Sequence, residues 1–212
     1  MILYDYCRSS AAYRVRIALN LKGLAYEQIP VNLLQGEQAE SANRARNAQG
    51  LVPSLDDGGE MLNQSLAICE YLDEAYPESE PLLPQDALAK ARVRSLAQLI
   101  ACDIHPVNNL RILKYLVAEF GVTDVQKTQW YQHWVMGGFA ALEKRLAESD
   151  QTGTFCHGDT PTLADICLVP QVFNAQRFNV DMFAYPTISR IAEHCNGLDA
   201  FARAHPNQQP DA

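Results

Sequence analysis

One stretch near the start of the chain decides the fold: MILYDYCRSSAAYRVRIALNLKG, residues 1–23. Residues 2–6 are short, apolar and aromatic, which is typical of a β-strand. Over residues 10–22 the apolar side chains recur at helical spacing, and Gly23 follows where such a helix would end. The stretch therefore predicts a strand that runs directly into a helix, with two serines at the turn between them.

The next fifty residues complete the pattern around this strand and helix. The expected elements are, in order, a strand over 26–31, a loop with one poor helix over 34–50, a hairpin of strands over 51–55 and 60–63, and a helix over 65–76. Parallel strands joined by a helix, followed by an antiparallel hairpin and a covering helix, predict a small α/β sandwich of the thioredoxin type.

A proline-rich segment separates this sandwich from the rest of the chain. Residues 76–84 read YPESEPLLP, and proline disfavours helix at its own position and at the one before. We therefore expect a first domain over residues 1–80 and an all-helical domain over residues 86–212. The helices expected there cover 87–118, with a kink at His105-Pro106, then 125–148, one that starts at the Thr162–Asp165 capping box, 187–195 and 198–205.

Composition narrows the classes of function. The chain has 212 residues, and 17 Lys and Arg against 25 Asp and Glu give a net charge of −8. This balance argues against nucleic acid or an anionic membrane as the main partner. No apolar run is long enough to span a membrane, and the first residues do not resemble a secretory signal. The six cysteines form no CxxC pair and the histidines have no metal-ligand spacing, so we expect no metal site and a reducing cytoplasm.

The turn Arg8-Ser9-Ser10 is the first candidate for chemistry. A serine at a helix N-terminus is ordinarily a cap, but two adjacent serines allow one to cap while the other faces a ligand. Lowering the pKa of a thiol by two units requires roughly 2.7 kcal/mol. A charge-assisted hydrogen bond supplies about 1.5–3 kcal/mol and a helix N-terminus about 0.3–1 kcal/mol. This turn could therefore hold a thiolate near neutral pH.

Two further positions have complementary chemistry. Val52-Pro53 stands where a thioredoxin-like sandwich often has a cis proline, which turns the preceding backbone N–H and C=O outward to pair with an extended peptide. The simpler interpretation is a trans proline at the start of an edge strand. Gln64-Ser65 begins another helix, whose amides could hold a carboxylate. A ligand that has a thiol, a peptide backbone and a carboxylate, as glutathione does, would fit these three sites.

Four motifs carry a resemblance to a known family: residues 8–19, Leu51-Val52-Pro53, residues 63–68 and the capping box within residues 160–165. They resemble the zeta-class glutathione transferases at the expected separations, over essentially the whole chain. The resemblance implies a glutathione transferase architecture and glutathione as cofactor. It also implies cis–trans isomerisation of maleylacetoacetate or maleylpyruvate in the breakdown of tyrosine and other aromatic compounds. A homodimer is expected from the same resemblance.

The resemblance assigns roles to individual residues of this sequence. Ser9 faces the glutathione sulfur, with Ser10 as its neighbour. Gln38 reaches the glycyl end, Val52 pairs with the cysteinyl backbone, and Gln64 with Ser65 holds the γ-glutamyl end. In the helical domain the segment 103–111 places His105, Asn109 and Arg111 over the sulfur. The residues implied in binding a small dicarboxylate substrate are Arg8, Arg111 and Arg177.

Two departures and three alternatives accompany these assignments. Ala11 replaces the family cysteine after the double serine, and Asn47-Ala48 replaces Asn-Pro, which could loosen the approach to Val52. The arginines could instead form ordinary surface ion pairs. Cys7-Arg-Ser-Ser10 is formally a CxxS sequence, so a thiol–disulfide enzyme that uses Cys7 is one rival. A glutathione-binding protein without catalysis is the other.

Overall fold

Strand β1 (Ile2–Asp5) and helix α1 (Ser10–Leu21) form where the opening stretch predicts them. The computed structural model describes residues 1–212. By their internal packing these residues divide into two units: Met1–Leu82 together with Asn196–Ala212, and Leu83–Cys195. The first unit contains the whole sheet, and the second is helical.

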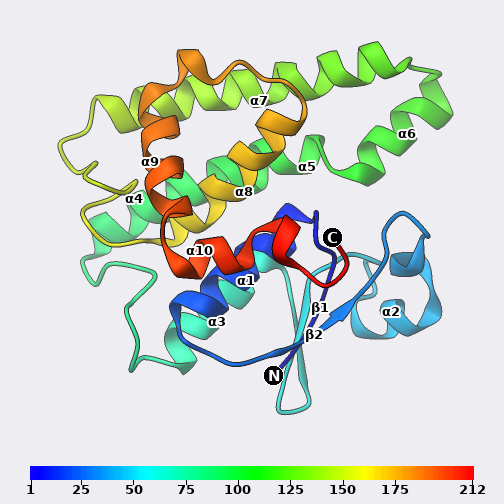
Figure 1. Ribbon diagram of the computed structural model, residues 1–212, viewed down its shortest axis with the longest axis horizontal. Coiled ribbons are helices and arrows are strands. Elements are labelled where there is room, and N and C mark those ends of the chain that lie inside the picture. Colours follow the sequence, from blue (N-terminus) through cyan, green and yellow to red (C-terminus); the bar gives the residue numbers. More distant parts are fainter. The chain divides into compact units, whose positions relative to one another are not determined.

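The sheet of the first unit has the order β2-β1-β3-β4. Its other strands are β2 (Glu27–Pro30), β3 (Ser54–Asp57) and β4 (Glu60–Asn63). β2 runs parallel to β1, whereas β3 is antiparallel to both β1 and β4. Helices α1 and α3 (Ser65–Ala75) lie side by side on one face, and α2 (Ser41–Arg46) lies on the other side of the sheet (Figure 1). The predicted thioredoxin-like sandwich is confirmed.

The polar segment 34–50 contains two short helices rather than one. A 3₁₀ turn spans Glu37–Ala39 and α2 follows it. The Glu37 carboxylate accepts the Asn32 N–H at 2.7 Å, which closes the loop before the turn. Helices of three and six residues are too short to show a periodic apolar face, because one helical turn already takes 3.6 residues. Sequence periodicity therefore could not separate them.

A buried arginine joins the two ends of the chain within the first unit. Arg16 forms a fully buried ion pair with Asp5 at 2.6 Å and donates to the Cys7 carbonyl at 2.9 Å. Its Nε donates to the carbonyl of Ala204, the last residue of helix α10 (Asp199–Ala204), at 3.0 Å. The sequence-based division assigned all of 86–212 to the helical domain, whereas residues 196–212 belong to the same unit as the sheet, with α10 packed on α1.

The second unit begins with a helical run that is broken more than once. Its helices are α4 (Ala87–Gln98), a π-helical segment (Leu99–Ile104), α5 (His105–Val107), α6 (Leu110–Phe120), α7 (Asp124–Ala147), α8 (Leu163–Arg177) and α9 (Pro186–Asn196). The interruption expected at His105-Pro106 is present between α5 and α6, but the change to π turns before His105 was not expected. Pro106 has no N–H, so the Cys102 carbonyl lacks its helical partner, and wide π turns precede the break.

Hydrogen bonds to a buried carboxylate fix the start of α8. The Asp165 carboxylate accepts the Thr162 N–H and hydroxyl, both at 2.8 Å, and the Cys156 N–H, also at 2.8 Å. Asp165 is fully buried, and burial raises its pKa against the effect of these donors. The predicted capping box is confirmed. It also connects α8 to the loop that precedes it.

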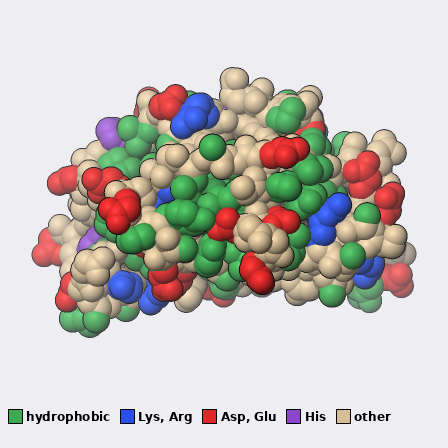
Figure 2. Space-filling model, turned by 90° about the horizontal axis from the view of Figure 1, so that it is seen from below, with side chains coloured by type: hydrophobic (Ala, Val, Ile, Leu, Met, Phe, Trp, Pro, Cys, Tyr) green, Lys and Arg blue, Asp and Glu red, His purple; other side chains and the backbone are tan.

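Three further features concern the helices, the charged side chains of one face and the cysteines. None of the helices combines the length and the apolar character needed to cross a lipid bilayer. Figure 2 shows one face of the molecule, on which Lys and Arg side chains lie singly or in small groups among acidic and apolar ones. All six cysteines are free thiols, and only Cys102 is exposed.

Candidate active site

One end of the sheet brings together most of the residues singled out in the first domain. Tyr4 of β1 pairs with Ser54 of β3, and Ser54 pairs with Asn63 of β4. The turn after β1, the residues before β3 and the residues after β4 therefore lie at the same end. Ligands of open α/β sheets bind at such an end, beyond the carboxyl ends of the strands. Ser9, Val52 and Ser65 are the residues that follow or precede these three strands.

Ser9 occupies the N-cap position of α1. Its backbone is extended, with φ −71° and ψ 116°, and its Oγ accepts the Ala12 N–H at 3.2 Å. An oxygen that accepts from an amide keeps its own O–H free to donate elsewhere. Ser10, in contrast, is buried in the first turn. The two serines therefore do not divide capping and ligand binding between them: Ser9 caps, and its hydroxyl proton is still available.

Hydrogen bonds to the N–H and the C=O of Cys7 hold the turn that carries Ser9. The Cys7 N–H donates to the Asp211 carboxylate at 2.9 Å, and its carbonyl accepts from Arg16 at 2.9 Å. The Cys7 thiol is buried and donates to the Asp211 carbonyl. Burial raises the pKa of the Cys7 thiol, and the Asp211 carboxylate raises it further. A buried thiol with a raised pKa is a poor nucleophile, which argues against the CxxS rival.

Val52 presents backbone groups without internal partners. The Val52–Pro53 peptide is cis, as the thioredoxin-like pattern predicts. Neither the N–H nor the C=O of Val52 forms a hydrogen bond within the protein. The loop before it is well held, because the Asn47 side chain donates to the Leu51 carbonyl at 3.2 Å and accepts the Gln49 N–H at 3.0 Å. Asn47 is buried, so these two hydrogen bonds hold the loop in a chain that has Ala48 in place of proline.

The N-terminus of α3 has no side-chain cap. Gln64 precedes the helix with φ +72°, a conformation that costs a residue with a side chain about 1–3 kcal/mol. Its side chain does not cap the helix but donates to Gln49 Oε1 at 2.7 Å. Ser65 is buried, and its Oγ accepts from Arg14 Nη1 at 3.3 Å. The first amides of α3 are therefore left for an anion.

Gln38 lies in the 3₁₀ turn on the same side of the sheet as α2. Its carbonyl accepts from the Asn43 side chain at 3.1 Å, and its Oε1 is buried without a hydrogen-bond partner. Gly50 passes close to it, since a Cβ at Gly50 would lie 3.0 Å from the Gln38 carbonyl and φ there is +63°. The structure thus holds the backbone of Gln38 firmly and leaves its side-chain carbonyl unpaired.

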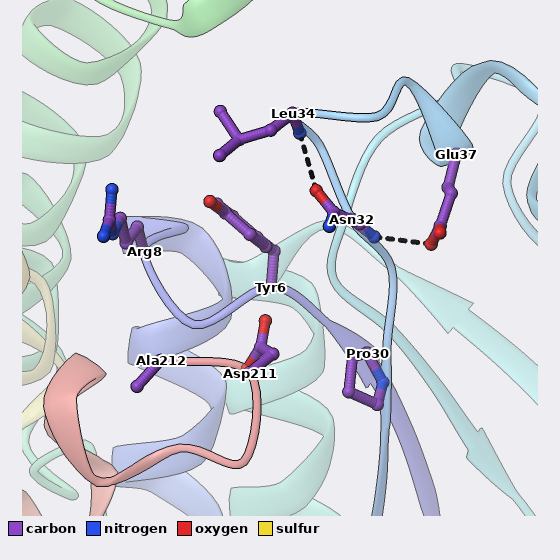
Figure 3. A pocket seen from close by; sticks show the side chains of 8 residues that line it. All are labelled: Tyr6, Arg8, Pro30, Asn32, Leu34, Glu37, Asp211 and Ala212. Atoms are coloured by element: carbon purple, nitrogen blue, oxygen red, sulfur yellow. Dashed lines mark hydrogen bonds between the residues drawn. The ribbon is translucent and has the colours of Figure 1, made fainter.

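A cavity of about 410 Å³ opens on the other side of β1 (Figure 3). Arg8 is exposed at its edge and forms no ion pair or hydrogen bond through its guanidinium, which differs from the surface-pair interpretation. The Asn32 side chain accepts the N–H groups of Leu34 and Gln35, and the Asn32 N–H donates to Glu37. The lining residues are Tyr6, Arg8, Pro30, Asn32, Leu34, Glu37, Asp211 and Ala212.

Sequence reasoning named only Arg8 among these lining residues. Pro30, Asn32, Leu34 and Glu37 come from a loop that carries no motif, and Asp211 comes from the other end of the chain. The one available signal was topological, because residues that follow a strand parallel to β1 must reach the same end of the sheet. No pattern in the sequence indicated that residues 209–212 return there.

The candidates of the second unit lie on separate elements of it. His105 begins α5, and Asn109 is the N-cap of α6, where its side chain accepts the Arg111 N–H at 3.1 Å. Asn109 thus has a structural role of its own. The exposed Arg177 ends α8, where it donates to the Asn174 side chain at 3.3 Å. Arg111 is exposed on α6, and no ion pair holds it or Arg177.

The fold and the site together define a class of protein. A thioredoxin-like sheet presents a hydroxyl at one helix N-terminus, unpaired backbone groups before a cis proline and an open second helix N-terminus. This donor set suits a thiol-containing peptide with a free carboxylate. Together with a helical second unit, it is the arrangement of a glutathione transferase.

Comparisons with known proteins agree with this class. Residues 3–80 match the family model of the glutathione S-transferase N-terminal domain, and residues 128–203 match that of the C-terminal domain. A probable maleylacetoacetate isomerase of Vibrio cholerae is 52% identical over 214 residues, which cover 100% of this chain and 98% of that protein.

Two solved structures are similar along the whole chain. One is the holo structure of a maleyl pyruvate isomerase, a bacterial zeta-class glutathione S-transferase, at 49% identity, TM-score 0.98 and 100% coverage of both chains. The other is a maleylacetoacetate isomerase of Methylobacterium extorquens AM1 with bound malonate and glutathione, at 44% identity, TM-score 0.97 and coverage of 100% of this chain and 99% of that one. The chain belongs to the glutathione S-transferase family and is a glutathione-dependent isomerase of its zeta class.

Proposed function

We propose that the protein converts a maleyl keto acid, maleylacetoacetate or maleylpyruvate, to its fumaryl isomer. The observation that carries the proposal is the exposed, unpaired guanidinium of Arg8 beside a cavity, one residue from the hydroxyl of Ser9. An unpaired arginine can take a carboxylate with two parallel hydrogen bonds. The Methylobacterium relative, whose structure has bound malonate and glutathione, supports a small dicarboxylate as the substrate.

The residues at the β3–β4 side of the sheet suit glutathione. The unbonded backbone groups of Val52 would pair with the cysteinyl residue. The first amides of α3, with Gln64 and Ser65, would hold the γ-glutamyl carboxylate. Gln38, whose Oε1 has no partner within the protein, would accept the N–H of the glycyl end. When bound, glutathione supplies a thiolate that adds to the cis double bond and leaves again after rotation, so it is regenerated.

The residues of the first unit then have defined tasks. Ser9 donates its free O–H to the sulfur and stabilises it as an anion, and the N-terminus of α1 adds to this effect. Ser10 supports the first turn. Arg8 orients a substrate carboxylate on the β2 side of β1, so that the double bond lies next to the sulfur. Donors that are fixed before the reaction also stabilise the transient enolate.

The second unit supplies the remaining assignments of this proposal. His105, Asn109 and Arg111 would contribute to binding near the sulfur, and Arg177 would take the second substrate carboxylate. Support comes from the position of Arg111 and Arg177 at helix ends, where both guanidinium groups are exposed and neither is ion-paired. Asn109 would act mainly by capping the helix that carries Arg111.

The test follows loss of each cis substrate with and without glutathione. We expect turnover only with glutathione. In the same assay Arg8→Gln should raise KM for the substrate by about 10- to 100-fold, the equivalent of one charge-assisted hydrogen bond. The control Arg203→Gln changes an exposed arginine of α10 that pairs with Asp199, and its KM should stay at the wild-type value. Rates that are indifferent to glutathione would exclude the proposed reaction.

We further propose that the protein acts in the cytoplasm as a homodimer. Six free thiols and no disulfide suit a reducing compartment. The homodimer is an expectation from the family resemblance. Light scattering during size-exclusion chromatography would measure the mass in solution, and a monomer at micromolar concentration would contradict it.

A further inference from the structure

Arg14 is a buried cation that lacks a counterion. It is 2% exposed, and within the protein its guanidinium makes one hydrogen bond, from Nη1 to Ser65 Oγ at 3.3 Å. Its Nε and Nη2 atoms are buried and have no partner. Arg16, two residues on, is equally buried but is neutralised by Asp5 at 2.6 Å.

An unpaired charge in a protein interior is unfavourable unless an anion reaches it. The open N-terminus of α3 lies directly beside Arg14, because Ser65 is the first residue of that helix. An arginine only donates hydrogen bonds, so Ser65 must accept from it and turn its own O–H elsewhere. The helix start therefore offers free amides and a hydroxyl donor, with a full positive charge behind them.

We propose that Arg14 is a positioning residue for the cofactor: acting through Ser65, it makes the start of α3 selective for a carboxylate, that of the γ-glutamyl residue of glutathione. This inference rests on the proposed placement of glutathione. It assigns the γ-glutamyl anion a counterion from the interior of the protein, in addition to the helix amides. Ser65 is then both the contact to the ligand and the connection to the charge.

The test compares two ligands by calorimetry with the full-length protein: glutathione, and γ-aminobutyryl-cysteinyl-glycine, which lacks only the α-carboxylate. Arg14→Met and Arg14→Gln remove the charge, and Gln retains a donor toward Ser65. We expect glutathione affinity to fall by about 10- to 100-fold in both variants, as for a charge pair at intermediate dielectric. Affinity for the analogue should stay within about twofold, since an uncharged group gains little from a nearby cation.

Arg14→Lys is the charge-retaining variant and should recover most of the preference for glutathione over the analogue. Arg16→Met is the matched control for loss of a buried arginine, and it should not change the ratio of the two affinities. Equal weakening of both ligands in the Arg14 variants, or no change in either, would overturn the proposal. Wild-type protein that binds neither ligand would instead overturn the proposed placement of glutathione. If one neutral variant does not fold, the other and Arg14→Lys still measure the ratio.

Discussion

At the scale of single residues, Ser9 and Ser65 use their hydroxyl groups in the same way. Each oxygen accepts from a donor that cannot accept in return, the Ala12 amide for Ser9 and the Arg14 guanidinium for Ser65. Each hydroxyl proton is thereby directed away from its helix. Capping and ligand binding are usually treated as alternatives for a serine at a helix start, but here they are compatible.

This geometry leads to a prediction for Ser9 that separates its two roles. Ser9→Ala should lower the free energy of unfolding by about 0.5–2 kcal/mol, whereas Ser9→Gly should lower it by only a few tenths, because glycine is a tolerable N-cap. Both variants lack the hydroxyl, so both should raise the pKa of the bound glutathione thiol by the same amount. Ultraviolet titration of the thiolate measures this pKa. If the thiol pKa instead differed between the Ala and Gly variants in parallel with their stability, a direct role of the Ser9 hydroxyl at the sulfur would be contradicted.

The sequence identified most of the residues at the end of the sheet, because hydroxyls, a proline and a polar pair follow or precede strands at recognisable places. It could not identify Arg14 as unpaired. Whether a buried arginine has a counterion depends on residues far away in sequence, such as Asp5 for Arg16. Local spacing carries no information about such pairs.

At the scale of elements, the close approach of the π-helical segment and α7 depends on one glycine. A Cβ built on Gly138 would overlap with the Cγ1 and Cδ1 atoms of Ile104, the last residue of the segment, which is buried. Gly137, its neighbour, faces open space. The π-helical segment before His105 therefore packs directly against the α7 backbone.

We expect Gly138→Ala to destabilise the protein by about 1–3 kcal/mol, as overpacking of a buried contact does. Gly137→Ala is the matched control and should be neutral or stabilising by about 0.5–1 kcal/mol, since alanine is the better helix former. Chemical denaturation of the two variants gives both values. Equal stability of the two would show that Ile104 moves aside without cost.

Helix boundaries could be predicted where a cap or a turn residue marks them. Thr162 and Asp165 mark the start of α8. Gly23 marks the end of α1. The π turns were not predictable, because the residues from Leu99 to Ile104 keep a helical apolar pattern and differ only in which carbonyl each amide reaches. That choice depends on Pro106 and on packing against α7.

At the scale of the whole molecule, the first unit is built from both ends of the chain. Arg16 and Asn20 on α1 donate to the carbonyls of Ala204 and Ala200 at 3.0 and 2.9 Å. Asp211 then reaches back to Cys7. The proline-rich segment predicted a domain boundary near residue 80 but could not predict that a later segment returns, because that contact depends on tertiary packing.

Asp211→Ala should therefore loosen the turn that carries Ser9. We expect a loss of about 1–3 kcal/mol of stability from the unpaired Cys7 N–H. The pKa of the Cys7 thiol should fall, because the Asp211 carboxylate raises it, so Cys7 should react faster with thiol reagents near neutral pH. Peptide mapping must locate the label, since Cys102 is exposed and reacts first. Asp199→Ala, an exposed acid of α10, is the control and should leave Cys7 labelling unchanged.

The return of residues 196–212 to the sheet bears on how the protein is made. A ribosome releases the chain from its first residue onward, so α1 and the strands emerge long before α10 exists. Until then the buried Arg16 lacks its Ala204 acceptor, and Cys7 lacks Asp211. The helical unit, a continuous run of sequence, can assemble during synthesis, whereas the pocket end of the sheet is finished only after residues 196–212 have been made.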